Sequence, residues 1–118
     1  MRERIRDKER LIHMLTAIDN LLDGSQRYTV EQAEKDTIIF YGFVKQVEII
    51  GEATYKLTKE FRVAHPEIEW DVIEGMRHVL VHGYFEITPH KVWSVIEKDL
   101  PILRPQIEQY IKEEESQK

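Results

Sequence analysis

The chain has 118 residues, a formal net charge of −5 and no cysteine. This length favours a single domain over residues 1–118, with enough buried surface for a hydrophobic core. The lack of cysteine excludes disulfides, thiolate nucleophiles and thiolate metal sites. The net charge argues against broad, sequence-independent binding of nucleic acid. The N-terminus is too charged for a signal peptide and no apolar run has the length of a membrane span, so we expect a cytoplasmic protein.

The first segment, over about residues 2–22, is predicted to be an amphipathic helix. Its apolar residues follow the spacing of a buried stripe: Ile5, Ile12, Leu15, Ile18 and Leu22. Gly24 is a typical stop signal for this helix, so the residues up to Thr29 are expected to form a loop. Thr29 and Gln32 have the spacing of a capping box, which predicts a short helix or an irregular lead-in after Thr29.

A second long helix is predicted from about Asp36 to Phe61, because apolar residues keep a helical spacing throughout. His65 precedes Pro66, and a residue before proline disfavours helical backbone angles. We therefore expect the chain to turn at His65.

The third predicted helix runs over about residues 69–82, and Gly83 is well placed to end it. A fourth helix is predicted from Pro89, whereas Pro101 and Pro105 are expected to kink or break the path of the chain. The last predicted helix continues an apolar stripe of Leu103, Ile107, Tyr110 and Ile111.

No turn signal of the hairpin type lies between alternating runs, so no sheet is predicted. The expected fold is an all-α, antiparallel bundle of about five helices. Gly51 and Gly75 lie inside predicted helices, where glycine costs about 1 kcal/mol relative to alanine. Either two helices cross closely at these residues, or the helices simply tolerate the two glycines.

The stretch "RHVLVHGYF", residues 77–85, gathers chemically active side chains at the end of the third predicted helix. In a continuous helix Arg77 and His82 are about 140° and about 7.5 Å apart, so they share a cleft only if the helix ends near Gly83. Arginine holds a phosphate with two hydrogen bonds and histidine transfers a proton, a pair that suits phosphodiester cleavage. The alternative is that both residues serve the helix dipole or a salt bridge.

A metal site is the other interpretation of the same stretch. His78 and His82 are four residues apart, as in zinc-binding H-E-x-x-H helices, but "HVLVH" has valine where the glutamate stands. A third ligand would have to be His65, His90 or Glu74, and nothing in the sequence indicates which. No metal is therefore predicted.

Two carboxylates, Glu48 and Glu52, stand within the apolar stretch "VEIIGEA". Carboxylates on a helix are usually solvated, but this context favours partial burial and pairing with a cation. No serine lies on a strand-to-helix elbow, and no glycine-rich phosphate loop is present.

The motif and its surroundings resemble a known family. "RHVLVHGYF" matches the R-x4-H-x-Y pattern of the HEPN superfamily, in the branch of the HepT-like toxins. "VEIIGEATYKL", "HPEIEWDVIEGMR" and "VWSVIEKDLPILRPQIE" also resemble family segments, in that order, so the resemblance covers nearly the whole chain. It implies a five-helix homodimer and a metal-independent endoribonuclease without a cofactor. Arg77 and His82 would line a cleft shared by two subunits, as catalytic residues.

The resemblance also implies a partner, a small nucleotidyltransferase antitoxin of the MntA type that transfers AMP onto the motif tyrosine, here Tyr84. Family members often have asparagine after the motif arginine, whereas this chain has His78, which adds a titrating group to the site. We assign His78 and Glu52 as auxiliary site residues.

Some family members have no demonstrated nuclease activity, so fold alone does not establish the chemistry. One alternative is a non-catalytic nucleotide- or RNA-binding partner subunit of the nucleotidyltransferase, with Arg77 as a phosphate clamp. Another is a structural dimerisation domain in which the motif forms a network of salt bridges.

Overall fold

The computed structural model describes residues 2–75 and 87–116, and the regular secondary structure in these ranges is entirely helical. Residues 70–75 are helical as well. The other elements are α1 (Arg2–Arg27), α2 (Val30–Lys35), α3 (Thr37–Tyr55), α4 (Lys59–Ala64), α6 (Pro89–Ser94), the π-helical segment η2 (Val95–Asp99) and α7 (Leu100–Ser116). The predicted all-α class is confirmed, with more and shorter helices than the five expected.

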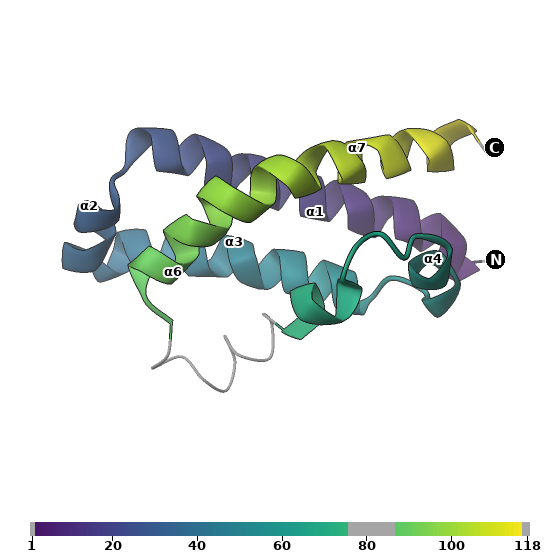
Figure 1. Cartoon of the computed structure of the whole chain (residues 1–118), viewed down its shortest axis with the longest axis horizontal. Coiled ribbons are helices and arrows are strands. Elements are labelled where there is room, and N and C mark those ends of the chain that lie inside the picture. The colour runs from purple at the N-terminus through teal and green to yellow at the C-terminus, as the bar shows by residue number, and fades with distance from the viewer. Residues whose placement is uncertain (1, 76–86, 117–118) are drawn as a thin grey trace.

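Three long helices, α1, α3 and α7, form the body of an elongated molecule of 47 × 28 × 22 Å. Figure 1 shows α1 running antiparallel to both α3 and α7, and both pack against it. Since α3 and α7 run in the same direction, the chain returns along the length of the molecule between Tyr55 and Pro89.

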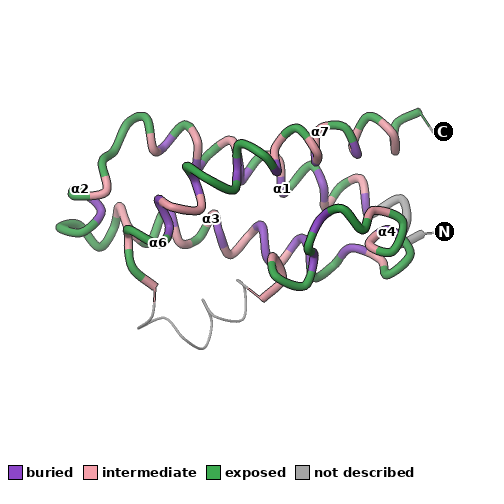
Figure 2. Tube along the Cα trace, in the orientation of Figure 1, coloured by how far each residue is buried: buried purple, intermediate pink, exposed green. Residues whose placement is uncertain are grey.

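The buried face of α1 forms the centre of the core. Leu11, Met14, Ile18 and Leu21 have no exposed surface, and Figure 2 shows buried positions recurring along the inner sides of the long helices. The predicted stripe is wrong at Ile12, which is 40% exposed. The helical spacing was compatible with two different buried faces of α1. The face that contacts α3 and α7 is the buried one, and Ile12 lies outside it.

The prediction that α1 stops at Gly24 is also wrong, because the helix continues to Arg27. An added Cβ at Gly24 would lie 3.0 Å from Cζ of Phe43 in α3, so this glycine permits close packing of two helices rather than ending one. The alternative of close approach at Gly75 finds no support among the described residues, since a Cβ there meets none of their atoms within 4 Å. Gly51 is buried.

The second predicted helix starts as expected, since the Asp36 side chain caps α3, but it does not continue to Phe61. Asp7 in α1 is fully buried. Its carboxylate accepts hydrogen bonds from the backbone N–H and the hydroxyl of Thr58, at 2.8 and 2.7 Å. Thr58 in turn caps α4, since its hydroxyl accepts from the N–H of Phe61. This contact between distant residues separates α3 from α4.

Two local predictions are confirmed. Thr29 and Gln32 form a capping box at the start of α2, with hydrogen bonds of 2.8 and 3.1 Å. The chain turns at His65, whose φ of −128° and ψ of 62° lie outside the helical region.

Pro101 and Pro105 were expected to kink or break the path of the chain, and a break is wrong because both lie within α7. The backbone N–H of Leu100 bonds to the carbonyl of Val95, five residues back, and the π segment thereby leads directly into α7. Pro105 lies inside α7. The predicted stripe of the last helix is confirmed, with Leu103, Ile107 and Tyr110 buried and Ile111 partly buried.

The glycines provide a matched test of this packing. We expect Gly42→Ala to raise the free energy of unfolding by roughly 0.5–1 kcal/mol, because its Cβ meets no atom of residues 2–75 and 87–116 within 4 Å and alanine favours the helix. Gly24→Ala should lower it, because the new Cβ crowds the buried Phe43 ring. Urea denaturation of both variants measures the difference, and equal stabilisation by both would contradict the close contact.

Candidate functional site

Four of the five predicted site residues, Arg77, His78, His82 and Tyr84, lie within residues 76–86 and thus outside the described residues. Their expected arrangement, including a helix end at Gly83, stays a prediction. The structure does describe the helical residues 70–75 that lead into the motif, and the contacts that fix them in place.

Arg62 of α4 fixes the position of residues 70–75. Its Nη2 donates to the carbonyl of Thr54 at 2.7 Å and to Oε1 of Glu74 at 2.6 Å. Nη1 lies 3.8 Å from the carboxylate of Asp71. The Arg62 side chain is only 19% exposed, and its Nε is buried without a hydrogen-bond partner among the described residues. One guanidinium therefore ties the end of α3 to the segment that precedes the motif.

An aromatic cluster supports the same segment from the other side. The indole Nε1 of Trp70 donates to the carbonyl of His65 at 2.9 Å, and both rings pack around Phe61 and Tyr110. The Tyr110 hydroxyl donates to Oε2 of Glu67 at 2.6 Å. This hydrogen bond lowers the pKa of the Glu67 carboxyl, while burial and the same hydrogen bond raise the pKa of Tyr110.

A surface pocket of about 630 Å³ opens beside this support. Arg62, Trp70, Asp71 and Glu74 contribute to its lining, so it borders the segment that leads into the motif. The pocket is lined by both positive and negative groups, since Arg62 is paired with the carboxylates of Asp71 and Glu74.

Glu52, the fifth predicted site residue, lies on α3. Its carboxylate is 41% exposed and lies 3.7 Å from Nζ of Lys56, while Glu48 lies 3.1 Å from Lys45. The expected partial burial and cation pairing are confirmed for both carboxylates. Glu52 also lines a small pocket of about 130 Å³ with Arg10, whose Nε is buried without a hydrogen-bond partner in the described part of the chain.

The residues considered as third metal ligands have other contacts. Nδ1 of His65 donates to the carbonyl of Phe61 at 2.8 Å, and its Nε2 lies 3.5 Å from Glu113. Nε2 of His90 lies 3.2 Å from Glu34. Within residues 2–75 and 87–116 no three histidine, aspartate or glutamate side chains lie together as metal ligands would.

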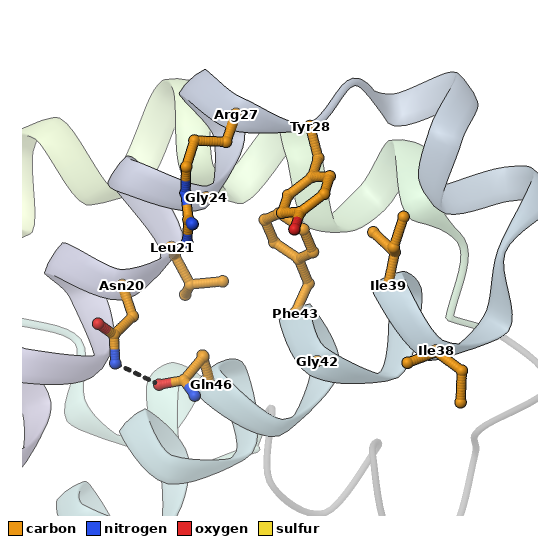
Figure 3. A pocket seen from close by; sticks show the side chains of 10 residues that line it. All are labelled: Asn20, Leu21, Gly24, Arg27, Tyr28, Ile38, Ile39, Gly42, Phe43 and Gln46. Atoms are coloured by element: carbon orange, nitrogen blue, oxygen red, sulfur yellow. Dashed lines mark hydrogen bonds between the residues drawn. The ribbon is translucent and has the colours of Figure 1, made fainter.

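A further pocket, of about 360 Å³, lies between the C-terminal half of α1 and the N-terminal half of α3 (Figure 3). We call it the α1–α3 pocket; it is lined by Asn20, Leu21, Gly24, Arg27, Tyr28, Ile38, Ile39, Gly42, Phe43 and Gln46. No sequence pattern predicted this pocket. The one local signal was Gly42, a glycine within the helical stretch "FYGFV".

No helix in the described ranges combines the length and the apolar character that crossing a membrane requires.

Comparison with known proteins identifies the class. The Ribonuclease HepT-like family matches residues 14–110. A relative from Caldanaerobacter subterraneus, named "Putative RNase", is 36% identical over 104 residues, which are 88% of this chain and 93% of the relative. The "Probable ribonuclease HepT" of Thermococcus cleftensis is 29% identical over 105 residues, 89% of this chain and 96% of the relative. No solved structure matches the chain.

The helical fold, the motif and these relatives define a ribonuclease-like helical protein of the HEPN type. The chain belongs to the HepT-like ribonuclease family.

The contacts of Arg62 generate a testable expectation. Arg62→Lys keeps the charge but lacks the guanidinium, whose Nη2 donates to both Thr54 and Glu74. We therefore expect the free energy of unfolding to fall by roughly 1–3 kcal/mol. Arg104→Lys is the matched control, since Arg104 binds Asp19 through two nitrogens at a more exposed position and should cost less. Urea denaturation compares the two, and an equal loss would contradict a special role for Arg62.

Proposed function

We propose that this chain is the toxin component of a toxin–antitoxin pair, a metal-independent endoribonuclease that works as a homodimer. Arg77 and His82 are its catalytic residues. The observation that carries the proposal is the R-x4-H-x-Y motif at residues 77–84, within a chain that the HepT-like family matches over residues 14–110. The names of the relatives support the same activity.

The chemistry follows from the two side chains. The 2′-hydroxyl oxygen of RNA attacks the adjacent phosphorus, and the bond from phosphorus to the 5′-oxygen breaks. His82 takes the proton of the attacking hydroxyl, and the second subunit's copy of the same histidine gives a proton to the leaving oxygen. Arg77 binds the non-bridging oxygens and stabilises the charge that builds up on them.

The support around the motif favours a positioned site. Arg62 and Trp70 fix the segment just before Arg77 through hydrogen bonds of 2.6–2.9 Å. A rigid support of this kind is what catalysis by positioning and charge stabilisation needs. In this proposal His78 and Glu52 are auxiliary residues that adjust the charge around the site.

Regulation is proposed to occur at Tyr84. The partner, a nucleotidyltransferase antitoxin of the MntA type, directs the Tyr84 oxygen to the α-phosphorus of ATP. Pyrophosphate leaves and the phenol loses its proton. The attached AMP brings bulk and a negative phosphate next to Arg77, where it competes with RNA.

Cleavage of RNA is the first test. Purified protein incubated with total RNA should cleave it equally well with and without EDTA, because Arg77 supplies the positive charge that a metal would bring. Arg77→Ala and His82→Ala should each lower the rate roughly 100-fold or more. Activity that disappears in EDTA and returns with zinc or magnesium would contradict the proposal. RNA binding without cleavage would favour the non-catalytic subunit instead.

The oligomeric state is the second test. We expect light scattering at micromolar concentration to give the mass of a dimer, since one motif supplies a single histidine where the reaction uses both an acid and a base. A monomer that cleaves RNA at full rate would contradict a site shared by two subunits.

The modified residue is the third test. With the cognate nucleotidyltransferase, ATP and magnesium, mass spectrometry should find AMP on Tyr84, and the modified protein should no longer cleave RNA. Tyr84→Phe keeps the ring but lacks the acceptor oxygen, so cells that express it should stop growing even when the active partner is present. Full protection of those cells by the partner would point to inhibition by binding alone.

A further inference from the structure

We propose that the α1–α3 pocket binds a nucleobase of single-stranded RNA and thereby contributes to substrate affinity apart from the motif. The inference rests on the proposed function, because that function makes RNA the substrate. Four observations carry it: an unexplained glycine, aromatic walls, an oriented amide and the charge of the chain.

Gly42 is the first observation. It lies in the interior of α3, where glycine costs about 1 kcal/mol relative to alanine. No contact within the described part of the chain explains that cost, because an added Cβ meets nothing within 4 Å. At Gly24, by contrast, Phe43 fills the space. A bare backbone on the wall of a pocket is what the close approach of an external group requires.

One wall of the pocket carries an aromatic ring on which a base can stack, since Tyr28 is 36% exposed whereas Phe43 is buried. Tyr28 and Phe43 lie edge to face, with ring centroids 6.3 Å apart and an interplanar angle of 86°. The guanidinium of Arg27 lies 5.7 Å from the centre of the Tyr28 ring. Figure 3 shows these side chains around one opening between the two helices. Unstacked RNA bases bind to aromatic rings and arginine planes of this kind.

An amide on α3 provides polar recognition. Nδ2 of Asn20 donates to Oε1 of Gln46 at 3.2 Å (Figure 3), which fixes the orientation of the Gln46 amide. Nε2 of Gln46 has no hydrogen-bond acceptor among the described residues, and Oε1 keeps a second lone pair. A glutamine amide held in this way offers a donor and an acceptor side by side, which matches the edge of a base.

The charge of the chain favours recognition of a base over recognition of phosphate. The net charge is −5, and the cation at the rim, Arg27, is paired with Asp23 at 3.2 Å. Stacking and hydrogen bonding to a base depend less on net charge than phosphate contacts do. The volume of about 360 Å³ lies within the range of roughly 300–1,000 Å³ that is common for small-molecule sites.

Fluorescence anisotropy with a short single-stranded RNA tests the proposal. The RNA carries 2′-O-methyl groups, so it has no 2′-hydroxyl to attack the phosphate and stays intact. Gly42→Leu places an apolar side chain at the pocket wall, where an added Cβ meets no described atom within 4 Å, and it should weaken binding about tenfold, the loss expected for one stacked base. Gln46→Ala should also weaken binding, and it serves as a second variant should the leucine disturb α3. Tyr41→Ala is the matched control, since Tyr41 is exposed on the same helix but does not line the pocket.

Three outcomes would contradict the proposal that the pocket binds a base of RNA. Unchanged affinity of both Gly42→Leu and Gln46→Ala would do so, as would an equal loss in Tyr41→Ala, which would place binding on the helix surface. A dimer that dissociates in Gly42→Leu, seen by light scattering, would mean that a second copy of the chain occupies the pocket.

Cleavage of unmodified RNA by the wild type separates the two proposals. If the wild type cleaves and Gly42→Leu binds normally, only the pocket fails; if binding depends on the pocket and nothing is cleaved, only the nuclease fails.

Discussion

The inner face of α1 is the constraint on which the other elements depend. Leu11, Met14, Ile18 and Leu21 are completely buried, and a helix that buries one stripe between two neighbours has to receive both on the same side. α3 and α7 both pack there and run in the same direction, opposite to α1. Consequently the chain between them has to return from one end of the molecule to the other, and the R-x4-H-x-Y motif belongs to that returning stretch.

The same arrangement separates two regions of the described structure that the proposals involve. Near α4, the guanidinium of Arg62 and the indole of Trp70 hold the residues that lead to the motif. Near α2, Gly42 leaves open space on α3, and the Tyr28 ring and the Gln46 amide border that space. Under the two proposals, the motif supplies the chemistry and the α1–α3 pocket supplies part of the affinity for RNA.

Sequence patterns predicted the structural features that depend on neighbouring residues and missed those that depend on contacts between distant residues. The capping box at Thr29 and the turn at His65 are local, and both were predicted correctly. The break between α3 and α4 involves Asp7, which lies 51 positions before its partner Thr58, and no local pattern reveals this contact. Gly24 was misinterpreted for the same reason, since its role depends on the ring of Phe43. The motif could be recognised because its residues are close together in the sequence. The α1–α3 pocket could not, because two separate helices form it.

The π segment η2 is a place where the chain can lose a residue. A π turn adds one residue to a helical path, and each residue rotates a regular helix by about 100°. Losing one residue from Val95–Asp99 would convert the π turn into a regular α-helical turn, and Leu103, Ile107 and Tyr110 would keep facing α1. The same loss in the regular part of α7 would rotate the residues beyond it by about 100° and bring polar side chains toward α1. A single-codon deletion in η2 that spares its buried side chain, Ile96, should therefore be less damaging than one in α7.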